Sequence, residues 1–196
     1  IRNEGRGYFN QSILTRLNKR IDGSSLKSAV ETLVQRHSML RARFSHVGQG
    51  QSMKQRITRE VTSSFRLQIH TVEDLGDIDA IVANSQQSIN CFTGPVIAVD
   101  LIDINGESQL LSLLGDHLIV DIVSWRLILE DLEELMISPE RTTLAGSTMP
   151  FQIWCSGQAE HCEKHLEELE SAPPDSFSFW GVETPITDRK STRLNS

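Results

Sequence analysis

Residues 110–125 read Leu-Leu-Ser-Leu-Leu-Gly-Asp-His-Leu-Ile-Val-Asp-Ile-Val-Ser-Trp. The first five residues form a short apolar run that favours a buried strand, and the amphipathic pattern from Trp125 onward favours a helix. His117 and Asp121 therefore lie where a strand passes the chain to a helix. At such a junction polar side chains can reach a cleft while their apolar neighbours stay buried. On spacing alone, however, a purely structural histidine is the more frequent explanation.

The rest of the chain alternates between strand and helix patterns. Asn105-Gly106 separates two apolar segments and predicts a β-hairpin, because both residues tolerate positive φ. Strands are expected at 9–17, 41–46, 52–57, 65–69, 96–104 and 108–114, and helices after Asp22 or Ser24, around 78–89, from 125 onward and after Pro150. This order predicts one α/β (or α+β) domain with a mixed sheet flanked by helices.

Composition excludes several function classes. The 196 residues carry a formal net charge of −7, which argues against nucleic-acid binding. No apolar run approaches the roughly 20 residues of a membrane span. The three cysteines lack metal-type spacing and are expected to be buried thiols in a reducing compartment, the cytoplasm. The acidic residues of the helix after Trp125 are expected to form a solvated face: Glu130, Asp131, Glu133 and Glu134.

Five ordered segments, covering roughly residues 8–182, resemble motifs of the condensation superfamily of nonribosomal peptide synthetases. They are Tyr8–Ser12 (HFNQS, epimerization-type members), Arg36–Phe44 (RHxxLRxxF), Asp116–Ile122 (HHxxxDG), Phe151–Cys155 (FQxW) and Phe179–Gly181 (YWG). The Val-Ser-Trp that ends at Trp125 also resembles epimerization-type members. The resemblance is therefore to an epimerization-like subgroup.

The resemblance implies a chloramphenicol-acetyltransferase-like half-domain. Residues 1–187 are expected to be the N-terminal subdomain of a condensation or epimerization domain, truncated at both ends. Its expected partners are the missing C-terminal half and carrier domains, whose phosphopantetheine holds aminoacyl or peptidyl groups. Because that tether belongs to the carrier, the domain itself is expected to bind no cofactor and no metal. The isolated chain is expected to be inactive.

The resemblance also assigns roles to residues of the 116–122 motif. It makes His117 the acid/base or positioning residue, accessible to solvent, and gives Asp121 a structural role, buried and paired with Arg41 or Arg43. In epimerizing members the histidine works with a glutamate from the C-terminal half. Two residues depart from the motif, since Asp116 replaces its first histidine and Ile122 its glycine. The alternative is a catalytically inactive carrier-docking or scaffold domain.

The last nine residues, 188–196, differ in character from the rest of the chain. They carry three basic residues and one acidic residue and match the translation of a sequencing-library adapter. We expect this segment not to be native and not to pack, because Leu194 alone cannot offset the entropy of ordering it.

Overall fold

The computed structural model describes residues 9–48, 53–138, 144 and 149–170, with side chains described only as far as residue 162. Tyr8, the 179–181 motif and the 188–196 segment lie outside the described residues. The chain divides into two compact units, Ile1–Phe151 and Gln152–Ser196, which are described separately.

A four-stranded mixed sheet is the centre of the first unit. Its strand order is β1 (Asn10–Arg16), β6 (Ser108–Asp116), β5 (Ile97–Ile104) and β4 (Phe65–Val72). β6 is antiparallel to both of its neighbours, whereas β4 and β5 are parallel. The mixed sheet predicted from the sequence is thus confirmed.

The turn between β5 and β6 is made by two residues with positive φ, as the Asn-Gly sequence predicts. Asn105 and Gly106 have φ values of 49° and 75°. The Glu107 N–H donates to the Ile104 carbonyl at 2.9 Å, which closes the turn. The predicted hairpin is confirmed, and it pairs the two most buried strands of the sheet.

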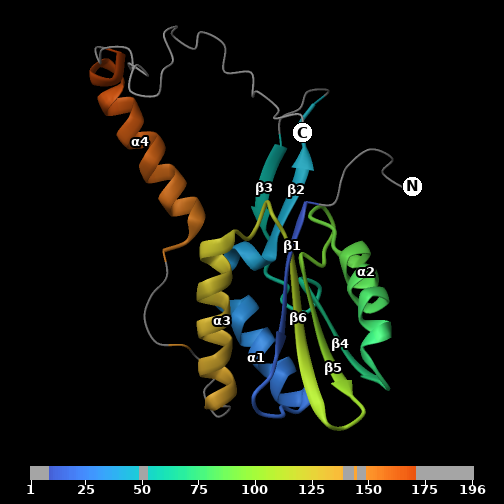
Figure 1. Ribbon diagram of the computed structural model, residues 1–196. Coiled ribbons are helices and arrows are strands. Elements are labelled where there is room, and N and C mark those ends of the chain that lie inside the picture. The colour runs from blue at the N-terminus through green and yellow to red at the C-terminus, as the bar shows by residue number, and fades with distance from the viewer. Residues whose placement is uncertain (1–8, 49–52, 139–143, 145–148, 171–196) are drawn as a thin grey trace, which may run out of the picture. The chain divides into compact units, whose positions relative to one another are not determined.

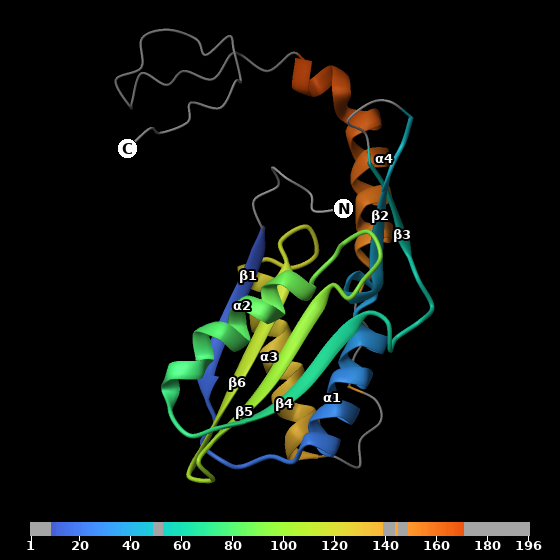
Figure 2. The same ribbon diagram turned by 90° about the vertical axis from the view of Figure 1, so that its right-hand side faces the viewer.

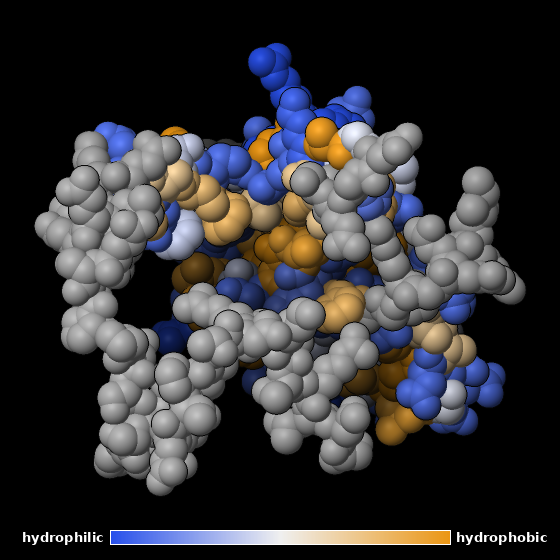
Figure 3. Space-filling model, turned by 90° about the horizontal axis from the view of Figure 1, so that it is seen from above, coloured by the Kyte–Doolittle hydropathy of each residue, from blue (hydrophilic) through white to orange (hydrophobic). Residues whose placement is uncertain are grey.

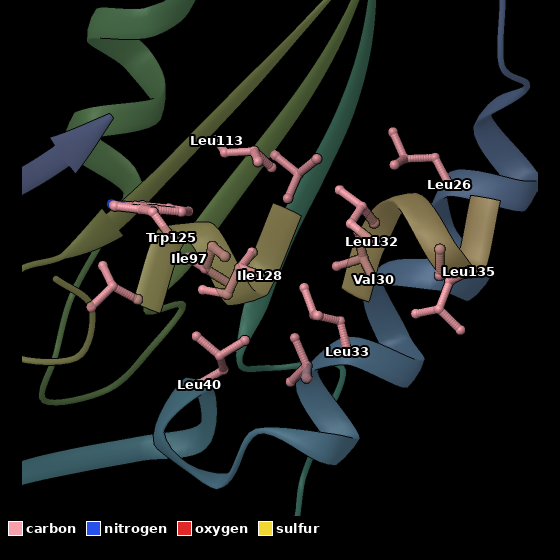
Figure 4. Close-up of a cluster of buried hydrophobic side chains, with 14 of the residues drawn as sticks. Leu26, Val30, Leu33, Leu40, Ile97, Leu113, Trp125, Ile128, Leu132 and Leu135 are labelled. Atoms are coloured by element: carbon pink, nitrogen blue, oxygen red, sulfur yellow. The ribbon is translucent and has the colours of Figure 1, made fainter. Parts of the chain in front are cut away.

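Helices cover both faces of this sheet. α1 (Gly23–Arg36) and α3 (Ile122–Ile137) lie on one face, and α2 (Ile78–Ser88) lies on the other (Figures 1 and 2). α2 follows the short 3-10 helix η2 (Leu75–Asp77). The larger core fills the space between the sheet and the α1–α3 pair, where Leu113, Val30 and Leu132 meet from three different elements (Figure 4). Each such side chain contributes about 1.5–3 kcal/mol when removed from water.

Asp22, one of the two capping residues that the sequence offers, is the N-cap of α1. Its carboxylate accepts hydrogen bonds from the Ser24 and Ser25 N–H groups at 3.0 and 2.9 Å. Hydrogen bonds from the hydroxyls of the same serines, followed by those from the backbone, hold the pKa of Asp22 well below its usual range. The carboxylate thus satisfies donors that the first helical turn leaves unpaired.

A separate two-stranded sheet follows α1. The 3-10 helix η1 (Ser38–Arg41) leads into β2 (Ala42–His46), which pairs antiparallel with β3 (Met53–Ile57). Arg43, on β2, is buried and donates to the Ser63 carbonyl at 3.0 Å and to the Ser64 hydroxyl at 3.2 Å. Burial lowers the pKa of Arg43 from its usual value.

The second unit is described through α4 (Phe151–Glu170), which begins directly after Pro150 as predicted. Cys155 and Cys162 are exposed on this helix, whereas Cys91 is buried in the first unit. The expectation that all three thiols are buried is therefore wrong for two of them. Within the described part of the chain, no helix is both long enough and apolar enough to span a bilayer.

Candidate active site

His117 directly follows the end of β6, the strand that lies between β1 and β5. Its N–H donates to the Phe9 carbonyl at 2.7 Å, which extends the pairing of β1 and β6 by one residue. The N–H groups of Ile119 and Val120 then donate to the Asp116 carbonyl at 2.9 and 3.1 Å, so the chain turns back immediately. His117 is exposed at this turn, and its predicted accessibility is confirmed.

Gly115 allows this turn to lie tightly against the strand. A Cβ atom at position 115 would be 2.8 Å from Val120 Cγ2 and 3.3 Å from Trp125 Cζ2. Val120 and Trp125 are both buried, so neither side chain can easily move away. The absence of a side chain at 115 therefore determines how closely the loop and the first turn of α3 approach β6.

Both ring nitrogens of His117 have a polar neighbour. Nδ1 lies 2.9 Å from the Val120 carbonyl oxygen, and Nε2 lies 3.2 Å from Nε2 of Gln11. A carbonyl oxygen can only accept, so the hydrogen bond to Val120 requires the proton on Nδ1. In neutral His117 the lone pair is then on Nε2, the nitrogen that can accept a proton from a substrate.

The two departures from the motif both have ordinary local roles. The Asp116 carboxylate accepts from the Leu118 N–H at 2.9 Å and so stabilises the turn itself. Ile122 is the first residue of α3, and among the described residues only Asn105 and glycines have positive φ. The loop therefore needs no glycine at position 122, and Ile122 does not distort it.

The expected ion pair between Asp121 and Arg41 is wrong. Asp121 is exposed and is the N-cap of α3, where its carboxylate accepts from the N–H and the hydroxyl of Ser124, both at 2.7 Å. These two hydrogen bonds, with the hydroxyl contributing more, lower the pKa of Asp121. Ser124 is only three residues after Asp121, so this cap forms locally. The carboxylate therefore needs no distant arginine.

Arg41 instead closes the C-terminal end of α1. Its guanidinium donates to the carbonyls of Val34, Gln35 and Thr58 at 3.0, 3.2 and 2.7 Å. The last carbonyls of a helix have no partner within the helix, and a cation near them is favoured by the helix dipole. Arg41 thus joins α1 to the segment after β3. The guanidinium of Arg43 likewise donates elsewhere, to the Ser63 carbonyl.

The segments that adjoin His117 carry exposed apolar side chains. They lie on the strand edge, on the turn and on the first turns of α3: Phe9, Leu118, Ile122, Val123 and Leu127. Ile122 is 77% exposed, which is unusual for a large aliphatic residue. Seen from above, the surface shows hydrophobic side chains exposed among hydrophilic ones (Figure 3). The imidazole of His117 is therefore exposed next to apolar surface.

Sequence reasoning missed the link between Gln11 and Trp125. The Trp125 indole N–H donates to Gln11 Oε1 at 3.0 Å, and the same amide faces His117. Trp125 is 2% exposed, so this hydrogen bond lies within the packed part of the unit. The available signal was the alternation of residues 9–17, which places polar Gln11 on the same face as Ile13. Within the described residues, no three His, Cys, Asp or Glu side chains group as metal ligands.

The chain is similar in sequence to nonribosomal peptide synthetases. The chain is 45% identical over 188 residues to nonribosomal peptide synthetase 1 of Aspergillus fumigatus and 40% identical over 186 residues to the synthetase nlsA of Emericella nidulans. These matches include 93% and 95% of this chain. The chain spans only 3% of the length of either relative.

Solved structures of low sequence identity share the fold. The epimerization domain from the third module of tyrocidine synthetase B aligns with 86% of this chain and 41% of its own, at a TM-score of 0.65 and 22% identity. The condensation domain of the monacolin K polyketide synthase MokA aligns with 88% and 37%, at a TM-score of 0.71 and 18% identity. The condensation domain family model matches residues 2–171, and the chain therefore belongs to the condensation domain family.

Proposed function

We propose that this chain is part of a nonribosomal peptide synthetase condensation domain in which His117 acts as a base. The proposed substrates are aminoacyl or peptidyl groups held as thioesters on the phosphopantetheine of carrier domains. The observation that carries the proposal is the exposed imidazole of His117, whose Nδ1 is bonded to Val120 and whose Nε2 is the nitrogen able to accept a proton. The exposed apolar side chains on the adjoining segments suit contact with an uncharged thioester.

In peptide-bond formation, Nε2 of His117 accepts the proton of an attacking amine. The nitrogen forms a bond to the thioester carbon, the carbon–sulfur bond breaks, and the thiol leaves with a proton. Family membership and the names of the relatives support this reaction. An imidazole suits such a transfer because its protonation changes near neutral pH.

Epimerization is the second candidate. Here Nε2 removes the proton from Cα of the thioester, and a second acid returns a proton to the opposite face, so no bond is gained or lost overall. The 8–12 segment and the Val-Ser-Trp sequence resemble epimerization-type members, and the contact of Gln11 with both His117 and Trp125 brings those two segments together at the site. The second acid would come from the C-terminal half of the domain.

The alternative of an inactive docking domain rests on Asp116 and Ile122. Because both residues fit the turn and the helix without displacing His117, their presence supplies no physical reason for lost activity. We therefore favour the catalytic proposal.

An assay in heavy water separates these candidates. The intact synthetase, with its carriers loaded, is incubated in D₂O, and the carrier-bound products are analysed by mass spectrometry. Peptide without deuterium at Cα supports condensation, and deuterium at Cα supports epimerization. If neither product forms although the carriers bind, the docking alternative is correct and the catalytic proposal is wrong.

A further inference from the structure

We infer that Gln11 is a positioning residue that keeps Nε2 of His117 unprotonated, and that Trp125 fixes the orientation of Gln11 for this purpose. The inference rests on the proposed role of His117 as a base. It assigns a specific task to a side chain on β1 that is 106 positions from the histidine in sequence.

The indole of Trp125 is buried, and its N–H can only donate a hydrogen bond. Its N–H lies 3.0 Å from Gln11 Oε1, so this end of the amide must be the oxygen. The other end, which faces His117 at 3.2 Å, is then the NH₂ group. In this way a donor-only partner determines the amide orientation, which otherwise must be chosen between two alternatives.

The NH₂ group of Gln11 is itself only a donor. Its hydrogen bond to His117 therefore requires a lone pair on Nε2, and a proton on that nitrogen would point at the N–H of Gln11. The Val120 carbonyl independently requires the proton on Nδ1. Two partners on opposite sides of the ring thus fit the same neutral tautomer, and the Gln11 N–H leaves no acceptor for a proton on Nε2.

This arrangement has a consequence for proton transfer. A substrate donor must take the place of the Gln11 N–H, because Nε2 has a single in-plane lone pair. Once Nε2 is protonated, Gln11 cannot offer its oxygen without losing the hydrogen bond to Trp125. The neutral tautomer with its lone pair on Nε2 is therefore the form that matches all three contacts, which suits a base that must be neutral again for the next turnover.

Nitrogen NMR of the histidine rings tests the inference without any need for activity. The full 196-residue chain is labelled with ¹⁵N-histidine, and the His117 signals are assigned by their loss in His117→Gln. At pH 7 we expect Nδ1 of the parent to be pyrrole-type (protonated) and Nε2 to be pyridine-type (unprotonated). A pyrrole-type Nε2 in the parent would overturn the inference.

Gln11→Glu replaces the donor by a carboxylate of the same shape. The carboxylate can accept from Trp125 with one oxygen and from Nε2–H with the other, so both nitrogens of His117 should become pyrrole-type at pH 7. Ser12→Glu is the matched control, since it adds the same charge one residue away on the opposite face of β1. Its His117 spectrum should equal that of the parent.

Trp125→Phe is the second variant, and it serves if Gln11→Glu does not fold. Without the indole N–H the amide of Gln11 is free to turn and offer its oxygen, so Nε2 should gain pyrrole character. If a folded Gln11→Glu or Trp125→Phe protein retains the parent's His117 signals, Gln11 does not set the protonation and the inference is wrong. Loss of synthetase activity plays no part in this readout, so the test is separate from that of the proposed function.

Discussion

Gly115→Ala should destabilise the chain by crowding the turn that holds His117. The new Cβ would be 2.8 Å from Val120 Cγ2 and 3.3 Å from the Trp125 ring, whereas ordinary Cβ contacts begin at 3.4 Å. Val120 is β-branched and 3% exposed, so it must shift by several tenths of an ångström within a packed core. Overpacking of this kind costs about 1–3 kcal/mol.

Thermal unfolding followed by circular dichroism measures this cost. For a domain of this size, each kcal/mol lowers Tm by about 2–4 °C, so Tm should fall by ~2–12 °C. Gly157→Ala in α4 is the matched control, because a methyl group there meets nothing within 4 Å. It should not destabilise, since alanine is the better helix former. A Gly115→Ala protein as stable as the parent would refute the reasoning about the tight turn.

Further predictions concern two carboxylates. Asp121→Ala should lower the free energy of unfolding by about 0.5–2 kcal/mol in urea titrations, because it removes the cap of α3; an unchanged midpoint would show that the cap contributes nothing. Because the Ser124 hydrogen bonds lower the pKa of Asp121, its contribution should be complete above about pH 4 and should disappear as the pH falls further; Asp121→Asn, which keeps the cap, should weaken that acid dependence. Asp100→Ala should destabilise by about 3–5 kcal/mol, because it leaves Arg66 and His70 without their buried partner; a loss below about 1 kcal/mol would contradict this account.

The features that the sequence predicted correctly are local ones. Asp22 caps α1, and Asn105-Gly106 forms the hairpin, because each depends on residues a few positions apart. The strand and helix alternation likewise sufficed for the mixed sheet, and the apolar run at 110–114 placed His117 at the end of a strand.

The hydrogen-bond and ion-pair partners of polar side chains could not be predicted from the sequence, because they come from distant elements. Asp131 was expected on a solvated face, yet its carboxylate lies 2.5 Å from Nε2 of His37 and 3.3 Å from Nε of Arg36, because α1 packs against α3. Asp100 is fully buried beside Arg66 and His70, a grouping that exists only once β4 and β5 pair. For Asp121 the error was different, since a local cap was available and a distant arginine was preferred.

The central claim is that His117 is the base of this condensation domain. Its most direct test is the single-turnover rate of product formation by the intact synthetase carrying His117→Gln, compared with the parent and with the control variant His46→Ala, which removes an exposed histidine from β2. Removal of a general base lowers rates by about 10²–10⁴-fold, so we expect a loss of at least 100-fold in His117→Gln and parent-like turnover in the control. A His117→Gln synthetase that forms product at the parent's rate would contradict the claim.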